Sequence, residues 1–335
     1  MSAVAAAWTA VRDEGRTESG WHVRRVYPDA HCDLLAGIHQ PDDTPGLLLE
    51  TALTHVPGGL ALPRASGFGV ETSVLSGGLA GRVRFALALT DYSYGAIFTV
   101  LCEDVAVAAA EAPSAREAVR SWIGRLHAWQ AFMSRHGTTG LSESAVVGLI
   151  GELLVLREKI IPLAGTRSAL DMWAGPLGEP NDFALPSGFV EVKTTSRQVP
   201  EVLEIANVVQ LDDSRGAILL VHVHLRPDPS GLSLPDVVSS ARALIVESAP
   251  DRLIQFERLL IGAGYIDAQA DLYPTRYTPD RTEMYRVDAG FPRIRSAEVR
   301  PGLRSCRYSI ELHACVPYIT GGNTLREMMG ELNRG

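Results

Sequence analysis

The chain has 335 residues, with 31 Lys+Arg against 39 Asp+Glu and a formal net charge of −8. A protein that binds DNA mainly through its phosphates is usually basic, so this charge argues against a stand-alone, non-specific DNA binder. The content of 46% hydrophobic and 21% charged residues is typical of a folded soluble protein. The length exceeds one ordinary hydrophobic core, which predicts two or three units.

The sequence shows no sign of export or membrane insertion. Its clearest apolar runs, such as residues 105–110 and 217–221, have the length of a strand, so we expect no membrane partner. The first 16 residues lack a basic segment followed by an apolar one, which predicts no signal peptide. The four cysteines show no CxxC spacing, which suits a reducing compartment. Together these features predict a cytoplasmic protein.

The first region, residues 1–137, is expected to be rich in strands and to end in a helix. Gly and Pro separate short apolar runs at residues 46–49, 59–62, 83–89 and 96–102. Within the third run, large apolar residues alternate with smaller or polar ones, which predicts a half-buried strand. Apolar residues at helical spacing over residues 114–133 predict the closing helix.

A second helix is expected to begin after Ser142, a good N-cap, and to end at Pro162. Its residues are apolar almost all round. Glu152 lies in the middle of this apolar stretch, where a buried carboxylate needs a partner such as a metal, a lysine or an arginine. Alternatively, Glu152 lies on a narrow exposed strip of the helix and needs no partner. The sequence pattern does not decide between a buried and an exposed Glu152.

The later elements alternate in type. Residues 183–185 and 189–194 with a turn at 186–188 predict a β-hairpin, and residues 201–205 a third strand. Residues 216–225 are strongly apolar and predict a central strand. Helices are expected over 234–247 and 251–262, and strands over 284–287 and 308–316. The order predicts a mixed α/β (α+β) fold with a central sheet flanked by helices.

Only two of the 31 basic residues are lysines, Lys159 and Lys193. In a chain that uses arginine almost everywhere, a retained lysine suggests a task that arginine cannot perform, because the pKa of a lysine can be shifted. Lys159 lies in a charged helix end and is expected to be solvated. Lys193 follows Glu191 by two residues.

Side chains two apart on a strand share a face, so Glu191 and Lys193 are expected to project together. The hairpin turn returns Asp182 to the side of the same strand, although the sequence leaves the register open. Carboxylates attract hard divalent cations. A nearby lysine can activate water or balance negative charge. The cluster therefore predicts metal-dependent hydrolysis of a phosphodiester.

The pair Asn181-Asp182, the run Glu191-Val192-Lys193 and the upstream helical Glu152 resemble the PD-(D/E)XK nuclease signature, with Asn in place of the usual Pro. More specifically, the chain resembles a bacterial family of PD-(D/E)XK members of unknown function. The resemblance rests on residues 148–156, 173–176, 181–183, 191–194, 210–211 and 291–294.

This resemblance implies a restriction-endonuclease-like core over residues 138–226, followed by a region 227–335 that contacts DNA or docks a partner. It implies metal ligands at Asp182 and Glu191, with the Val192 carbonyl and Glu152 as further ligands. It implies Lys193 as the catalytic lysine and Glu152 as an auxiliary acid. Mg²⁺ is the expected cofactor, and Mn²⁺ should substitute for it.

The expected function is a Mg²⁺-dependent deoxyribonuclease, an endonuclease of a restriction–modification or anti-phage defence system. Methyltransferases and ATPases are the partners that the family setting implies, and cutting both strands would suit a homodimer. One alternative is a non-catalytic DNA- or protein-binding subunit that keeps the nuclease fold. Another is a hydrolase of RNA or of another phosphodiester.

Further polar residues are weaker candidates. Thr194 and Thr195 follow the lysine and would either contact substrate phosphates or form an exposed turn. Gln210 occupies a position where related nucleases sometimes place a polar active-site residue. His222 and His224 share a strand face, but as metal ligands they lack an identified third partner. Eight arginines between residues 276 and 307, interleaved with aromatic residues, suggest either a phosphate-contacting surface or ordinary solvated strand faces.

Overall fold

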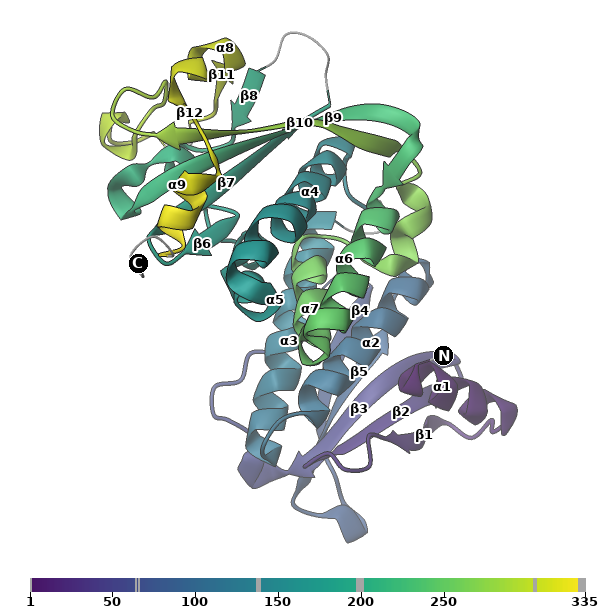
Figure 1. Ribbon diagram of the computed structural model, residues 1–335. Coiled ribbons are helices and arrows are strands. Elements are labelled where there is room, and N and C mark those ends of the chain that lie inside the picture. Colours follow the sequence, from purple (N-terminus) through teal and green to yellow (C-terminus); the bar gives the residue numbers. More distant parts are fainter. Residues whose placement is uncertain are drawn as a thin grey trace. The chain divides into compact units, whose positions relative to one another are not determined.

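The structure is a computed structural model that describes residues 2–63, 65, 67–136, 140–196, 202–303 and 306–330 (Figure 1). The chain divides into two compact units, Met1–Thr139 and Gly140–Gly335. The three regions expected from the sequence stay a prediction. Strand β9 (Ala217–Ser233), however, runs through the expected boundary at residue 226 without a break.

The first unit is built on an antiparallel sheet of five strands in the order β1-β2-β3-β5-β4. As predicted, Val83, Phe85, Leu87 and Leu89 of β5 are all buried. Trp122 of α3 packs against Phe85, with ring centroids 5.8 Å apart. The helices and strands of the first unit are α1 (Ala3–Asp13), β1 (Gly20–Val26), β2 (Asp33–Gln40), β3 (Thr44–Ala52), β4 (Phe68–Val74), β5 (Arg82–Leu89), α2 (Gly95–Ala110) and α3 (Ala115–His136).

Helix α2 corrects two expectations. Residues 96–102, expected as part of the strand-rich region, and residues 105–110, whose run has the length of a strand, belong to this one helix. A short run that is apolar on all sides has no period that separates a buried helix from a strand. The segment Tyr92–Ala110 is also long and apolar enough to cross a membrane on length and composition alone, whereas we expected apolar runs no longer than a strand. Such a match is weak evidence, since the core helix of a soluble protein passes the same test, and half of α2 is buried within the first unit. Residues 59–62 form no strand.

The second unit contains a mixed sheet in the order β12-β10-β9-β7-β6, with β9 in the centre as predicted. Strands β7 and β9 are parallel, and the other neighbours are antiparallel. The unit comprises α4 (Glu143–Val155), α5 (Ile161–Met172), β6 (Phe183–Leu185), β7 (Gly188–Thr195), β8 (Val202–Ile205), β9 (Ala217–Ser233), α6 (Leu234–Ser248), α7 (Leu253–Gly262), β10 (Arg276–Val287), β11 (Tyr308–Glu311), α8 (Leu312–Cys315), β12 (Ile319–Thr320) and α9 (Gly322–Met328).

The two faces of this sheet have different cover. Helices α4 to α7 pack on one face through the larger apolar core, which includes Val190 and Val192 of β7. The two-stranded sheet of β8 and β11 covers part of the other face through a smaller core around Tyr285 and Phe291. The prediction of a mixed α/β fold with a central sheet flanked by helices is therefore confirmed (Figure 1).

Two local expectations for this unit were wrong. Pro162 does not end the second helix, because α4 continues through a π-helical turn (Leu156–Ile160) and Pro162 falls in the first turn of α5, where no N–H is needed. Residues 308–316 form a strand only as far as Glu311 and then turn into α8. The third expected strand is present as β8 (Val202–Ile205), and it pairs with β11.

Candidate active site

The β6–β7 hairpin fixes the register that the sequence left open. Phe183 pairs with Val190 and Leu185 with Gly188, so Asp182 follows the same ladder toward the middle of β7. The Val192 N–H donates a hydrogen bond to Oδ2 of Asp182 at 2.7 Å. Asp182 is thus attached to the backbone of the strand that carries Glu191 and Lys193.

Glu191 and Lys193 project together, as expected from their spacing. Nζ of Lys193 lies 2.8 Å from Oε1 of Glu191. The Glu191 side chain is only 1% exposed, whereas that of Lys193 is 15% exposed. A carboxylate this deeply buried depends on the lysine for its counter-charge, because an unpaired charge in an apolar interior is very costly.

Two amides complete a ring of polar contacts around this pair. Nδ2 of Asn181 donates to Oε2 of Glu191 at 3.0 Å and to the carbonyl of Gln210 at 2.7 Å. Nζ of Lys193 donates to Oε1 of Gln210 at 3.1 Å, and the same oxygen accepts the N–H of Ala206 at 2.9 Å. Gln210 therefore belongs to the cluster through the lysine. We did not predict a functional role for Asn181. The sequence offered one indication of such a role, because the Asn181 amide directly precedes Asp182.

Glu152 reaches the same cluster from helix α4. It is half-buried, and Nε1 of Trp173 donates to its Oε2 at 2.9 Å. The partner of this carboxylate is thus an indole, which we did not anticipate. A Cβ atom placed on Gly175 would lie 3.0 Å from Oδ1 of Asp182 and 3.5 Å from Oε2 of Glu152, so both carboxylates border this one glycine.

The three carboxyl groups share an environment that disfavours their charge. Burial, and after it the charge of Asp182, raises the pKa of Glu191 to about 8 and that of Glu152 well above its ordinary value. Burial raises the pKa of Asp182 to about 6, against the opposing effects of the Val192 N–H and of Lys193. Desolvated acids that repel one another are typical of catalytic and metal-binding sites.

This cluster fits a divalent cation by its chemistry, since a cation would offset the mutual repulsion of Asp182 and Glu191. Among the described residues, no three side chains of His, Cys, Asp or Glu form a ready set of metal ligands. A cation here would therefore be held by one or two carboxylates together with oxygens of the main chain, solvent or substrate, the usual arrangement for Mg²⁺. For Val192 the structure shows that its N–H donates to Asp182 and that the residue pairs with Val221 of β9.

The two threonines after the lysine face in different directions. Thr194 points at helix α4, where a Cβ on Gly151 would lie 1.8 Å from its Oγ1, and this hydroxyl has no partner among the described residues. Thr195 lies within hydrogen-bond distance of Nε2 of the buried His222, at 2.8 Å. Nδ1 of His224 lies 3.1 Å from Asp280. Within the described chain, neither histidine belongs to a metal-ligand group.

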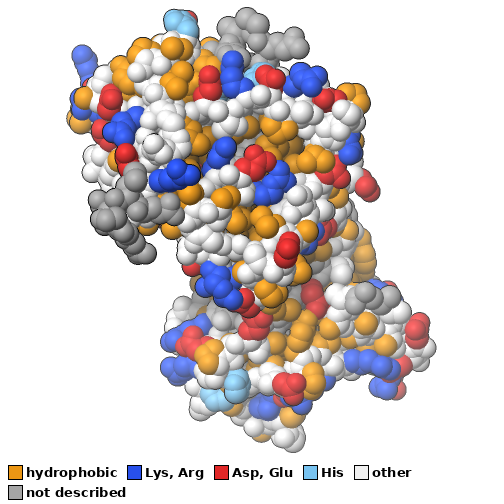
Figure 2. Space-filling view, in the orientation of Figure 1, with side chains coloured by type: hydrophobic (Ala, Val, Ile, Leu, Met, Phe, Trp, Pro, Cys, Tyr) orange, Lys and Arg blue, Asp and Glu red, His pale blue; other side chains and the backbone are white. Residues whose placement is uncertain are grey.

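Most of the described arginines between residues 276 and 307 are engaged within the chain. Arg276, Arg281, Arg286, Arg293 and Arg295 each pair with an acidic residue. Figure 2 shows Lys and Arg side chains next to Asp and Glu side chains, and the described residues on the face drawn form no continuous basic surface. This pairing favours solvated and structural roles over a phosphate-contacting surface. Arg304 lies outside the described residues.

Comparison with known proteins agrees with the geometry of the cluster. No curated protein and no solved structure gives a significant match to this chain. A family model described as "Putative PD-(D/E)XK family member (DUF4420)" matches residues 4–313, which covers both units and every residue of the cluster. The chain belongs to this PD-(D/E)XK family, whose name denotes a nuclease-type fold.

Proposed function

We propose that this protein is a metal-dependent endonuclease that hydrolyses DNA phosphodiester bonds. The observation that carries the proposal is the convergence of Asp182, Glu191 and Lys193 on one hairpin, with Glu152 beside them. The raised pKa values of the carboxyl groups add to it, because a site that disfavours three negative charges is suited to a cation.

In this proposal Asp182 and Glu191 hold Mg²⁺, with the Val192 carbonyl and Glu152 as further oxygen donors. The bound cation would lower the pKa of a water molecule and offset the charge that develops on the phosphate. Lys193 holds or moves a proton at the attacking water, or balances charge on the phosphate. Asn181 and Gln210 keep Glu191 and Lys193 in place by the hydrogen bonds described above.

The biological setting is also part of the proposal. The family resemblance supports a cytoplasmic role in restriction–modification or anti-phage defence, with a methyltransferase or an ATPase as partner. The net charge of −8 and the internally paired arginines support the use of such a partner, or of a homodimer, to bind DNA firmly.

The test is cleavage of supercoiled plasmid by the full-length chain in Mg²⁺, Mn²⁺ or EDTA, with Asp182→Ala beside the wild type. Asp171→Ala is the matched control, since Asp171 is an exposed acid of helix α5 that pairs with Arg252. We expect metal-dependent nicking that is lost only in Asp182→Ala. Equal cleavage by Asp182→Ala and the wild type would contradict the proposed site.

Two further measurements separate the alternatives. Competition between labelled RNA and DNA identifies a hydrolase whose substrate is RNA. If the wild type cleaves neither, Mn²⁺ titration decides between an enzyme that needs its partners and a non-catalytic subunit. Binding that Asp182→Ala loses supports the former, and the absence of binding supports the latter.

A further inference from the structure

The segment that carries Gln210 is a pair of short 3₁₀ turns, Val208–Leu211 and Asp213–Arg215. Such turns have little stability of their own. Oδ1 of Asn207 accepts the N–H groups of Val209 and Gln210, but these contacts lie within the segment. Oε1 of Gln210 also accepts the N–H of Ala206, just before the segment, at 2.9 Å. These local bonds orient the Gln210 side chain relative to its own segment, so the position of the segment as a whole depends on contacts with more distant parts of the chain.

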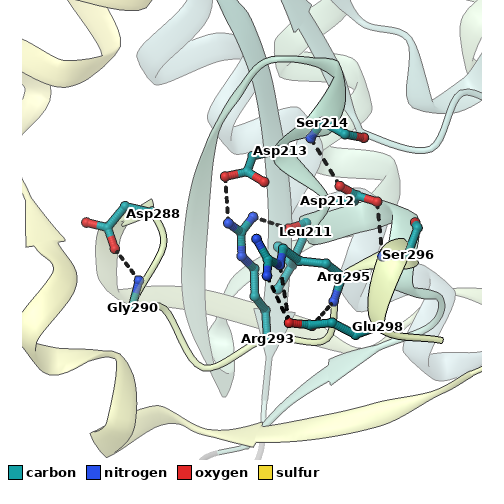
Figure 3. Close-up of polar contacts among 10 residues, drawn as sticks. All are labelled: Leu211, Asp212, Asp213, Ser214, Asp288, Gly290, Arg293, Arg295, Ser296 and Glu298. Carbon is teal, nitrogen blue, oxygen red and sulfur yellow. Dashed lines mark hydrogen bonds and ion pairs between the residues drawn. The ribbon is translucent and has the colours of Figure 1, made fainter.

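The loop that follows β10 supplies this support, and Figure 3 shows its contacts. Nη1 of Arg293 donates to the carbonyl of Leu211 at 2.6 Å, and Nη2 donates to Oδ2 of Asp213 at 2.6 Å. A third hydrogen bond lies beside these two, where the Ser296 N–H donates to Oδ2 of Asp212 at 3.1 Å. Hydrogen bonds from Ser296 and Ser214 lower the pKa of Asp212 to about 2, so this acceptor stays charged at neutral pH.

Arg293 differs from its neighbour Arg295 in a way that indicates its role. The Arg293 side chain is only 3% exposed and bridges two acceptors of the Gln210 segment. The Arg295 side chain is 48% exposed and pairs with Glu298, three residues further along its own loop. A guanidinium suits the first task because its planar fork can donate to two acceptors at once.

The main chain around Gln210 is thus held from two sides. Asn181 donates to the Gln210 carbonyl, and Arg293 donates to the next carbonyl, that of Leu211. Between these two anchors, the Gln210 side chain meets Nζ of Lys193.

We propose that Arg293 is a positioning residue for the lysine of the candidate active site, acting through Leu211 and Gln210. The assignment of activity rests on the proposed function, whereas the effect on Lys193 does not. The loop after β10 accordingly holds the Gln210 segment in place, and it does so through the buried side chain of Arg293.

The test uses the small number of lysines in the chain. In the full-length protein labelled with ¹³C at lysine Cε, only Lys159 and Lys193 give signals, and Lys159→Arg assigns them. In metal-free protein, Gln210→Ala provides the reference shift of the Lys193 signal. We expect Arg293→Met to move this signal in the same direction and Arg295→Met to leave it in place.

Plasmid cleavage provides the second measurement. Loss of a residue that orients a site residue commonly lowers activity about 10- to 100-fold. We expect this loss in kcat for Arg293→Met with KM unchanged, a partial recovery in Arg293→Lys, and no change in Arg295→Met. If the wild type does not cleave DNA, the proposed function fails while the Lys193 signal still tests the positioning role.

Arg293→Met can disturb folding, because it leaves Asp213 and the Leu211 carbonyl without their donor. Asp213→Asn then serves as the second variant, since it removes the ion pair that holds the Arg293 guanidinium in place beside the Leu211 carbonyl, and it keeps the shape of the side chain. A folded Arg293→Met or Asp213→Asn protein with an unshifted Lys193 signal would overturn the proposal. The same shift in Arg295→Met would overturn it as well.

Discussion

Nζ of Lys193 lies 2.8 Å from Oε1 of Glu191, so the second of the two lysines in the chain contacts the acidic side chain that is most deeply buried among the described residues. We expect Lys193→Ala to lower plasmid cleavage by about 10²- to 10⁴-fold, the usual contribution of a group that transfers a proton or stabilises charge. In the structure Lys193 contacts Glu191 and Gln210, so the pKa of Glu191 should rise further in this variant.

Lys193→Arg should fail as well, although it preserves the positive charge. The guanidinium is bulkier than an ammonium, and its pKa is too high for proton transfer near neutral pH. Lys159→Arg is the matched control, since it changes the other lysine of the chain, and we expect it to retain full activity. Full activity in Lys193→Arg would show that the choice of lysine at this position has no chemical purpose.

The raised pKa values predict how the stability of the metal-free protein depends on pH. A carboxyl group whose pKa is higher in the folded state binds its proton more tightly there, so the free energy of unfolding falls as pH rises. The fall begins at the unfolded pKa and is complete above the folded one, from 4.5 to about 8 for Glu191 and from 3.8 to about 6 for Asp182. Each pKa unit corresponds to about 1.4 kcal/mol.

Urea denaturation in EDTA at pH 5 and pH 8 measures this effect. We expect the wild type to be less stable at pH 8 and Glu191→Gln to lose much less stability over the same range. Asp212→Asn is the control, because the pKa of Asp212 is lowered to about 2 and the group stays ionised between pH 5 and 8. An identical pH dependence in Glu191→Gln and the wild type would contradict the assignment to Glu191.

The hydrogen bond from the Trp173 indole to Glu152 allows the role of Glu152 in cleavage to be tested separately from its effect on stability. Trp173→Phe removes the N–H that donates to Glu152 at 2.9 Å and leaves this carboxylate without that donor, at a cost of about 1–3 kcal/mol. Trp129→Phe is a matched control, because Trp129 is equally buried and donates to the carboxylate of Asp104 at 2.8 Å in the first unit. Both variants should lose stability, and only Trp173→Phe should lose plasmid cleavage. Equal plasmid cleavage by Trp173→Phe and Trp129→Phe would mean that Glu152 takes no part in the reaction.

The sequence predicts those parts of the site that depend on local periodicity. Period two along β7 places Glu191 and Lys193 on one face, and the turn at residues 186–188 returns Asp182 to the same strand, as the structure shows. Local patterns also predict the buried face of β5, the cap of Ser142 on α4 and the central position of β9.

The unforeseen parts depend on contacts between residues far apart in the chain. Trp173 meets Glu152 across 21 residues, and Arg293 meets Leu211 across 82. Contacts between residues so far apart along the chain leave no periodic pattern in the sequence from which they could be predicted. Helix α2 was missed for another reason, since uniform burial removes the alternation that separates helix from strand.

The approach of helix α4 to strand β7 gives the last prediction. Gly151 directly precedes Glu152, and a Cβ on it would lie 1.8 Å from Oγ1 and 2.9 Å from Cβ of Thr194. Gly151→Ala must therefore displace the helix or the strand, at a cost of about 1–3 kcal/mol for overpacking. Because Glu152 moves with the helix, cleavage should fall as well.

Gly148→Ala is the matched control, one turn earlier on the same helix, where a Cβ would meet no atom within 4 Å. Thermal denaturation should show this variant to be as stable as the wild type or up to about 1 kcal/mol more stable, since alanine favours a helix over glycine. Thr194→Ala removes the nearest atoms, so the double variant Gly151→Ala/Thr194→Ala should recover part of the lost stability. A Gly151→Ala protein that is as stable and active as Gly148→Ala would mean that close contact between α4 and β7 does not hold Glu152 in the site.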